Sequence, residues 1–187
     1  MEWILASASP RRRELLGDLI EKFEIIPAKG EETAPESCTV EELVKTLARQ
    51  KAEEVASLPR AAGKAVLGAD TVVAFNGTVL GKPKDEEDAI AMLSALSGNV
   101  HEVYTGVCVC FPEQNGEREI VTRAERTEVV FETLSKEQIE AYVATGSPMD
   151  KAGAYGIQDG GLVKKIIGSF SNVVGLPIEL CEKIIKR

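Results

Sequence analysis

Three consecutive arginines follow a serine and a proline near the start of the chain, in the segment SASPRRRELL that begins at Ser7. Ser9 is a typical N-cap and Pro10 a typical first helical residue, which predicts Arg11 and Arg12 in the first turn of a helix. Cations there repel the positive end of the helix dipole unless an anion binds at that end. Arginines form forked hydrogen bonds with phosphate oxygens, so this segment is a candidate phosphate site. A solvated charged turn is the alternative.

A lysine interrupts an apolar stripe on the next predicted helix, which runs from the capping box TVEE to about Ser57. Steps of four from Leu43 pass through Leu47, Lys51 and Val55, so Lys51 falls on the face predicted to be buried. A lysine at such a position either extends along its stem to water or meets a buried phosphate or carboxylate. Both interpretations are open from the sequence.

An aspartate and a lysine are predicted to meet at one end of the sheet. Asp70 follows the short apolar strand AVLGA, and the Asn76-Gly77 turn predicts a hairpin just beyond it. The register of that hairpin sets Lys82 opposite Thr71 and beside Asp70. Ligands of open α/β sheets bind at such strand ends, although a structural ion pair would use the same two residues.

An acidic loop supplies further carboxylates. Glu31 and Glu32 follow the second predicted strand, and either could hold a divalent cation together with Asp70. Mg²⁺ prefers a few carboxylates plus substrate phosphates, while most charged loops are simply solvated. Cations at Arg11 and Lys51 around these acids suit a polyphosphate with a bound metal.

A glycine-rich segment, DKAGAYGIQ, ends at Gln158. Its small residues let the backbone approach a ligand closely, and the Gln158 amide carries both a donor and an acceptor, as reading a base edge requires. A plain glycine-rich turn is the alternative. His101 is interpreted as structural rather than as a base, and Cys108 and Cys110 as small buried residues on one face of a strand.

Composition limits the classes of protein that this chain can be. The 187 residues carry a net charge of -8, which disfavours general nucleic-acid binding because phosphate neutralisation needs a basic face. No apolar run approaches the length of a membrane span. The first residues, MEWIL, lack the basic and long apolar regions of a signal peptide, so a cytoplasmic protein with no membrane partner is expected.

Strand and helix signals alternate along the chain and then give a run of strands with helices interspersed. This order predicts an α/β (α+β mixed) fold, in which a long twisted mixed sheet is flanked by helices. We expect one domain over residues 1–187. The segment 147–161 is expected to be a functional loop or a short helix with loops.

Together these motifs resemble the Maf family of nucleotide pyrophosphatases over essentially the whole chain. The resemblance is carried by SASPRRRELL at 7–16, the loop with Glu32, Lys51 in ARQKA, LGADT at 67–71, GKP at 81–83, DKAGAYGIQ at 150–158 and SNVVGLP at 171–177. It implies a fold like that of inosine triphosphate pyrophosphatases, elongated, with a cleft between two lobes. It also implies metal-dependent hydrolysis of a nucleoside triphosphate to the monophosphate and pyrophosphate, and a homodimer.

The resemblance also implies roles for individual residues. Arg12, Thr71 and Gln158 resemble the specificity residues of the dTTP/UTP branch. We expect Asp70 to act as the general base and, with Glu32, to hold Mg²⁺ or Mn²⁺. Lys82 is also expected to be a catalytic residue. The residues expected to bind the triphosphate are Ser7, Ser9, Arg11, Arg12, Lys51 and Lys82.

Two other functions are compatible with the same residues. One is a pyrophosphatase for 7-methyl-GTP or another modified nucleotide, which substrates assayed side by side would reveal. The other is a nucleotide-binding regulator of cell division without significant turnover. A set of acids and cations beside a metal argues against a pure binder, because binding alone has no need of a base.

Overall fold

The structure is a computed structural model that describes residues 1–186. Its strands are β1 (Trp3–Leu5), β2 (Glu24–Ile25), β3 (Ala65–Phe75), β4 (Thr78–Leu80), β5 (Val100–Cys110), β6 (Ile120–Phe131) and β7 (Val163–Ile167). Its α-helices are α1 (Pro10–Gly17), α2 (Val40–Ala56), α3 (Glu86–Leu96), α4 (Lys136–Ala144), α5 (Phe170–Val174) and α6 (Ile178–Ile185). Short 3₁₀ helices cover Pro59–Ala61 and three turns of the segment Ser147–Asp159.

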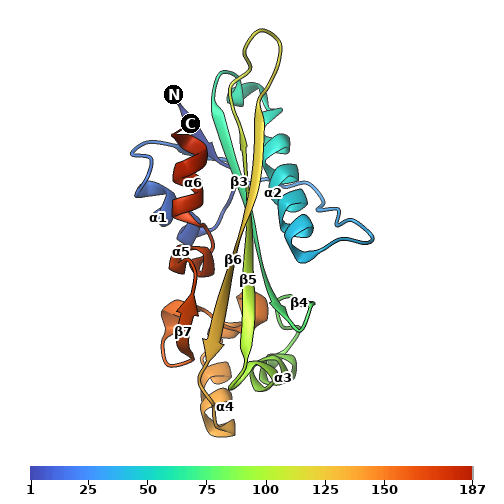
Figure 1. Ribbon diagram of the computed structural model, residues 1–187, viewed down its shortest axis with the longest axis vertical. Helices are drawn as coiled ribbons and strands as arrows, with labels where there is room; N and C mark the ends of the chain where they lie inside the picture. The colour runs from blue at the N-terminus through green and yellow to red at the C-terminus, as the bar shows by residue number, and fades with distance from the viewer. Residues whose placement is uncertain (187) are drawn as a thin grey trace. The chain divides into compact units, whose positions relative to one another are not determined.

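The strands form one seven-stranded mixed sheet in the order β2-β1-β3-β5-β6-β7, with β4 paired to β3 outside this path (Figure 1). β1 runs parallel to both β2 and β3, whereas β4 and β7 are antiparallel to their partners. The predicted mixed α/β fold is therefore confirmed. In residues 1–186 no helix has the length and apolar character needed to cross a membrane.

Local signals located the helix starts correctly. Ser9 caps α1 through its side chain and the capping box at Thr39 is present, both as predicted. Asp85 caps α3, and Ser135 forms a capping box at the start of α4. The prediction of two separate strands around residue 70 was wrong, because β3 runs unbroken from Ala65 to Phe75. Gly68 and Asp70 are residue types common in turns, yet the chain stays extended through both of them. The short helix α5 was not predicted.

The chain packs as two compact units. The first comprises Met1–Thr71, Thr105–Glu125 and Gly175–Arg187, and the second comprises Val72–Tyr104 and Arg126–Val174. β3, β5 and β6 contribute residues to both, since their ranges cross these boundaries. A single domain over residues 1–187 stays a prediction.

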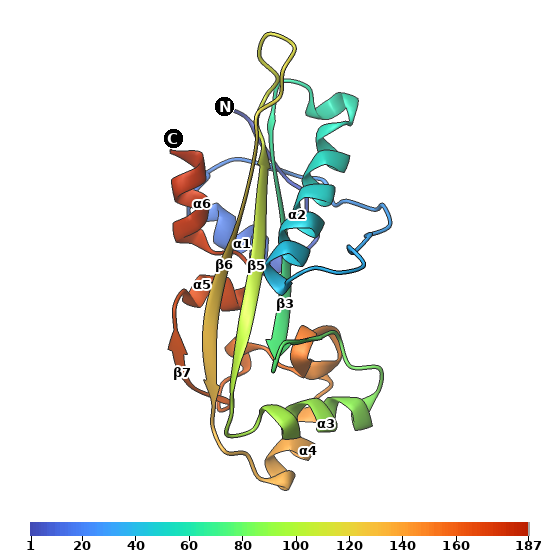
Figure 2. The same ribbon diagram turned by 45° about the vertical axis from the view of Figure 1, so that its right-hand side comes forward.

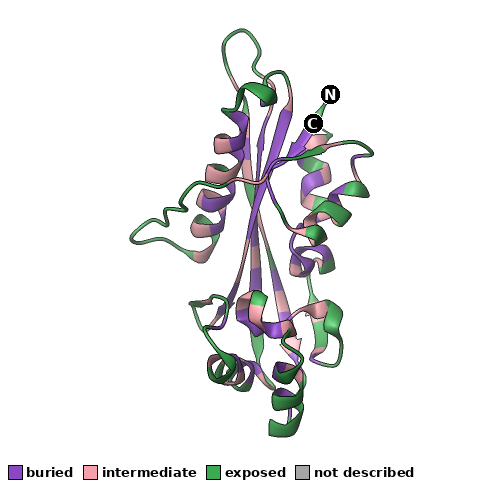
Figure 3. Cartoon of the chain, turned by 180° about the vertical axis from the view of Figure 1, so that it is seen from behind, coloured by how far each residue is buried: buried purple, intermediate pink, exposed green. Residues whose placement is uncertain are grey.

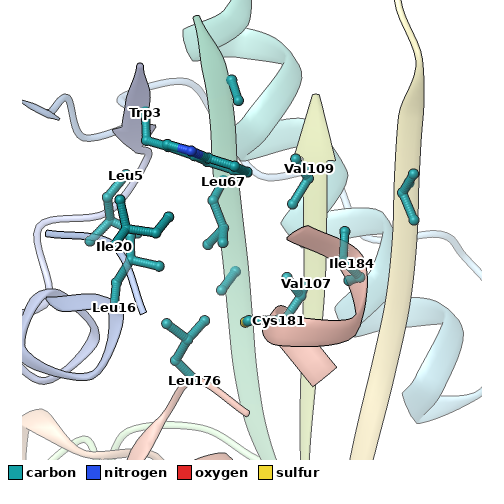
Figure 4. Close-up of a cluster of buried hydrophobic side chains, with 13 residues drawn as sticks. Trp3, Leu5, Leu16, Ile20, Leu67, Val107, Val109, Leu176, Cys181 and Ile184 are labelled. Carbon is teal, nitrogen blue, oxygen red and sulfur yellow. The ribbon is translucent and has the colours of Figure 1, made fainter. Parts of the chain in front are cut away.

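In the first unit helices cover both faces of the sheet, with α1 and α6 on one face and α2 on the other (Figures 1 and 2). Successive strand side chains alternate between these two cores. The strands are largely buried (Figure 3). Leu5, Leu67 and Val107 pack against α1 and α6 (Figure 4). Cys108 and Cys110 pack against α2, which confirms that both thiols are buried on one face.

Two strand glycines let α2 approach the sheet closely. A Cβ at Gly68 would lie 2.6 Å from the carbonyl oxygen of Ala48, and a Cβ at Gly106 only 2.1 Å from that of Val44. Both obstacles are helix backbone, which cannot rotate away as a side chain can. The close approach of α2 to β3 and β5 therefore depends on the absence of side chains at Gly68 and Gly106.

We predict that Gly106→Ala destabilises the protein by about 3 kcal/mol or more, since the added methyl group must push α2 away from the sheet. Urea unfolding measures the change. Gly17→Ala is the matched control, because a Cβ there meets nothing within 4 Å, and it should stay within about 1 kcal/mol of the parent. Equal stability of the two variants would contradict this account of the packing.

The core of the second unit contains the chain's histidine. α3 and α4 lie side by side over this core (Figure 2). Nε2 of His101 lies 2.7 Å from the Tyr155 hydroxyl, and its ring packs edge-on against Phe131. Burial lowers the pKa of His101 from 6.5 to about 4. These contacts agree with the interpretation of His101 as a structural residue rather than a base.

Because His101 stays neutral in the fold while the unfolded chain protonates it near pH 6.5, its contribution to stability is complete above pH 6.5 and is lost toward pH 4. The loss amounts to roughly 3 kcal/mol. We predict that His101→Gln flattens the fall in the free energy of unfolding between pH 6.5 and pH 4. Urea titrations of both proteins across this window measure it. Parallel pH profiles would show that His101 does not titrate in this way.

Candidate active site

The candidate site lies beyond the end of β1, in the first unit. The β1–β3 register stops at the pair Leu5–Leu67, after which the Ala6 amide donates to the Leu67 carbonyl at 2.8 Å. β3 continues, so Asp70 and Thr71 lie past the last residue of β1. Their side chains point to opposite faces, because successive residues of a strand alternate. Asp70 therefore faces the side of α2 and Thr71 the side of α1.

Arg12 is held on the α1 side by acceptors from distant parts of the chain. Its Nε donates to the Gly175 carbonyl at 2.9 Å, one terminal nitrogen donates to Thr71 Oγ1 at 3.0 Å, and the other to Ser7 Oγ at 3.4 Å. Ser9 Oγ accepts from the Arg12 amide as the helix cap. The guanidinium is thus oriented by three bonds, while its fixed fork has five donors.

Burial lowers the pKa of Arg12, and the negative charge of Asp70 offsets part of that effect. The charge of Arg11 lowers the pKa of Arg12 further, whereas that of Glu32 raises it. The carboxylates on the α2 side therefore act on the guanidinium on the α1 side. The structure bonds Arg12 to Thr71, the residue that directly follows Asp70, while the Asp70 side chain lies on the other face of the sheet.

On the α2 side, Lys51 joins two carboxylates. Its Nζ lies 2.6 Å from Asp70 Oδ1 and 2.9 Å from Glu32 Oε1. The Lys51 and Asp70 side chains are only 17% and 11% exposed. Of the two interpretations of Lys51, the buried carboxylate partner is therefore confirmed. Of the two loop acids, it is Glu32 that pairs with Lys51.

Lys82 and Gln158 belong to the second unit, and both are exposed. The predicted hairpin register is confirmed at Phe75–Thr78, Ala74–Val79 and Val73–Leu80, where the ladder ends. The next carbonyl, that of Gly81, accepts from the Gly153 amide at 3.1 Å. The expected pairing of Lys82 with Thr71 is thus not part of the ladder, and Asp70 forms its ion pair with Lys51 instead.

Two contributors to the site were missed in the sequence. The Gly175 carbonyl accepts from Arg12 and, at 3.3 Å, from Thr71 Oγ1, and the buried Thr105 hydroxyl lies 2.9 Å from Thr71 Oγ1. Gly175 has φ +131°, which other residues rarely adopt. The SNVVGLP motif could have pointed to Gly175, but no local sequence pattern pointed to Thr105.

Asp70 and Glu32 supply two carboxylates, and water or phosphate oxygens would complete the coordination of a divalent cation. Residues 1–186 contain no cluster of three or more His, Cys, Asp or Glu side chains able to hold a metal ion. Asp70 and Glu32 do converge on one cationic group, the Lys51 ammonium. Two carboxylates with phosphate oxygens and water are the coordination that Mg²⁺ favours, so the chemistry of this donor set fits the group.

The fold and sequence match known proteins. The HAM1 protein from Coxiella burnetii has a similar fold, with a TM-score of 0.53 at 16% identity over 100% of this chain and 98% of that one. A family model described as "Maf-like protein" matches residues 2–187. This chain belongs to the Maf family.

Curated relatives in this family share about half of their residues with the chain. A dTTP/UTP pyrophosphatase of Geotalea uraniireducens (strain Rf4) is 50% identical over 183 residues, which cover 97% of this chain and 91% of the relative. A dTTP/UTP pyrophosphatase of Thermococcus gammatolerans (strain DSM 15229 / JCM 11827 / EJ3) is 49% identical over 186 residues, covering 97% and 94% respectively. The match therefore spans the whole site.

We predict a coupling free energy of about 2 kcal/mol between Lys51 and Asp70, because both side chains are largely buried and removal of Lys51 leaves the Asp70 carboxylate without its ion-pair partner. Urea unfolding of Lys51→Met, Asp70→Asn and the double variant gives this value. The exposed pair Arg49–Glu53, whose side chains are 55% and 41% exposed, is the control and should couple by less than about 1 kcal/mol. Equal coupling in the two pairs would contradict the difference in burial.

Proposed function

We propose that this chain is a nucleoside triphosphate pyrophosphatase that hydrolyses dTTP and UTP to the monophosphate and pyrophosphate. The observation that carries the proposal is the position of Asp70 beyond the end of β1, where it pairs with Lys51 and directly precedes Thr71, which accepts from Arg12. A carboxylate among cations at a strand end is the arrangement that water attack on a polyphosphate requires. Membership of the Maf family and the named activity of its relatives support the same reaction.

In the proposed mechanism Asp70 takes a proton from the water that attacks the α-phosphorus, and the bond to the leaving pyrophosphate breaks. Arg12 is fixed by Ser7, Thr71 and Gly175, so it can donate its remaining N–H groups to phosphate oxygens without reorganising. Lys51 supplies a second positive charge beside Asp70. These residues orient the triphosphate and offset the charge that develops on it.

Asp70 and Glu32 are the residues that would hold the divalent cation. A bound Mg²⁺ or Mn²⁺ would make the water more acidic and neutralise negative charge on the phosphates. Glu32 reaches the site from a loop, and its side chain is 47% exposed. The chain therefore presents a largely buried carboxylate on β3 and a half-exposed carboxylate on a loop, both paired with the Lys51 ammonium.

Base recognition is assigned to Thr71, Arg12 and Gln158. Thr71 Oγ1 and the Arg12 guanidinium are bonded to each other, so a change at one alters the other. The roles of Gln158 in reading the pyrimidine and of Lys82 in binding phosphate rest on the resemblance alone, as does the placement of Ser9 and Arg11 against phosphate. A homodimer and a cytoplasmic location likewise stay predictions.

We predict that Asp70→Asn lowers kcat for UTP and dTTP by about 10²- to 10⁴-fold, because the amide cannot accept the proton. Released pyrophosphate is measured for both nucleotides with Mg²⁺ or Mn²⁺. Asp18→Asn makes the same chemical change at the end of α1 and should leave turnover unchanged. Near-normal turnover of Asp70→Asn would reject Asp70 as the base.

The substrate class is tested with the unmodified chain. Initial rates with UTP, dTTP and 7-methyl-GTP at equal concentration should favour the pyrimidines. A strong preference for 7-methyl-GTP would remove the pyrimidine assignment. Tight binding of UTP with no pyrophosphate released would instead indicate a nucleotide-binding regulator.

A further inference from the structure

We propose that Gln50 and Glu54 on α2 are positioning residues that place Glu32 beside Asp70 and thereby set the affinity of the site for a divalent cation. The inference deepens the proposed function and rests on it for the role of Glu32. Neither residue touches Asp70 or Lys51 through any recorded hydrogen bond within residues 1–186. Their side chains bind the backbone of the loop that carries Glu32.

Glu54 fixes the start of this loop. Its Oε1 accepts from the Lys29 amide at 2.7 Å, and its Oε2 accepts from the Gly30 amide at 3.0 Å. Charge-assisted bonds of this kind are about twice as strong as neutral ones. The loop also approaches Glu54 closely, since a Cβ at Gly30 would lie 2.8 Å from Glu54 Oε2.

Gln50 fixes the loop on the other side of Glu32. Its Oε1 accepts from the Thr33 amide at 3.0 Å, and its Nε2 donates to the Thr33 carbonyl at 2.8 Å. The oxygen and the nitrogen of the Gln50 side-chain amide therefore both bond to the backbone of Thr33. With Gly30 and Thr33 both bound to α2, only Glu31 and Glu32 lie between the two attachments.

Burial cannot hold this loop in place. Every residue from 29 to 39 is exposed, and the loop stands out from the sheet in Figure 3. A segment without buried apolar side chains opens locally unless other bonds restrain it. Besides the ion pair of Glu32 with Lys51, four hydrogen bonds from Gln50 and Glu54 restrain the loop and so the backbone position of Glu32.

The same helix also positions the rest of the cluster. Gln50 and Glu54 are four residues apart and share a helix face, and Lys51 follows Gln50 directly. Backbone contact at Gly68 fixes α2 against β3, the strand that carries Asp70. One rigid element therefore determines the positions of Lys51, Glu32 and Asp70 relative to one another, as a metal-binding set requires.

The test compares Glu54→Ala with the matched control Glu53→Ala, a neighbour on α2 that pairs only with Arg49 in the recorded ion pairs of residues 1–186. Two quantities are measured on the whole chain without nucleotide. Hydrogen–deuterium exchange reports the amides of residues 29–33, and Mn²⁺ titration followed by electron paramagnetic resonance reports the cation affinity. Gln50→Ala is the second variant, which removes the other attachment independently.

We expect Glu54→Ala and Gln50→Ala to speed exchange in residues 29–33 and to weaken Mn²⁺ binding by about 10-fold, the loss typical of removing a group that orients a metal ligand. Glu53→Ala should change neither. With UTP, the Mg²⁺ concentration at half-maximal rate should rise, while kcat at saturating Mg²⁺ stays close to that of the parent.

Faster exchange with unchanged Mn²⁺ affinity would overturn the proposal, because the bonds would then hold the loop without affecting the site. Unchanged exchange, or a parent protein that binds no Mn²⁺, would overturn it as well. Failure of the proposed function is recognised separately, since it appears as a lack of pyrophosphate release by the parent protein whatever the Mn²⁺ result.

Discussion

The site depends on the alternation of side chains along β3 where it extends past β1. Asp70 and Thr71 are neighbours in the chain, yet they serve opposite faces of the sheet. One meets Lys51 of α2 and the other meets Arg12 of α1. β1 ends at Leu5, so Asp70 and Thr71 both lie past the last residue of the neighbouring strand.

Burial and charge are balanced differently on the two faces. Arg12 is satisfied mainly by neutral oxygens, those of Gly175, Thr71 and Ser7, which orient the guanidinium without neutralising it. Lys51 is paired with two full negative charges. The α1 face therefore keeps an unneutralised positive charge, while the α2 face combines one cation with two carboxylates.

Short-range signals in the sequence were enough to predict much of this structure. The caps at Ser9 and Thr39, the first three hairpin pairs and the burial of Lys51 follow from residues within one or two turns of each other. The contacts that the sequence did not predict correctly are those decided by tertiary packing. Gly81 bonds to Gly153, over seventy positions away, and so the hairpin register stops before Lys82. Thr105 supports Thr71 from another strand, which no local pattern encodes.

The anchor of the Arg12 guanidinium is a main-chain oxygen rather than a side chain. Any amino acid would supply that atom, so chemistry alone does not restrict what can stand at position 175. The backbone conformation does restrict the residue at position 175, because φ of +131° excludes nearly all residues that have a Cβ. Substitution at position 175 is therefore limited by backbone geometry. If the bond from Arg12 to this carbonyl were lost, exchanging one polar residue for another would not restore it.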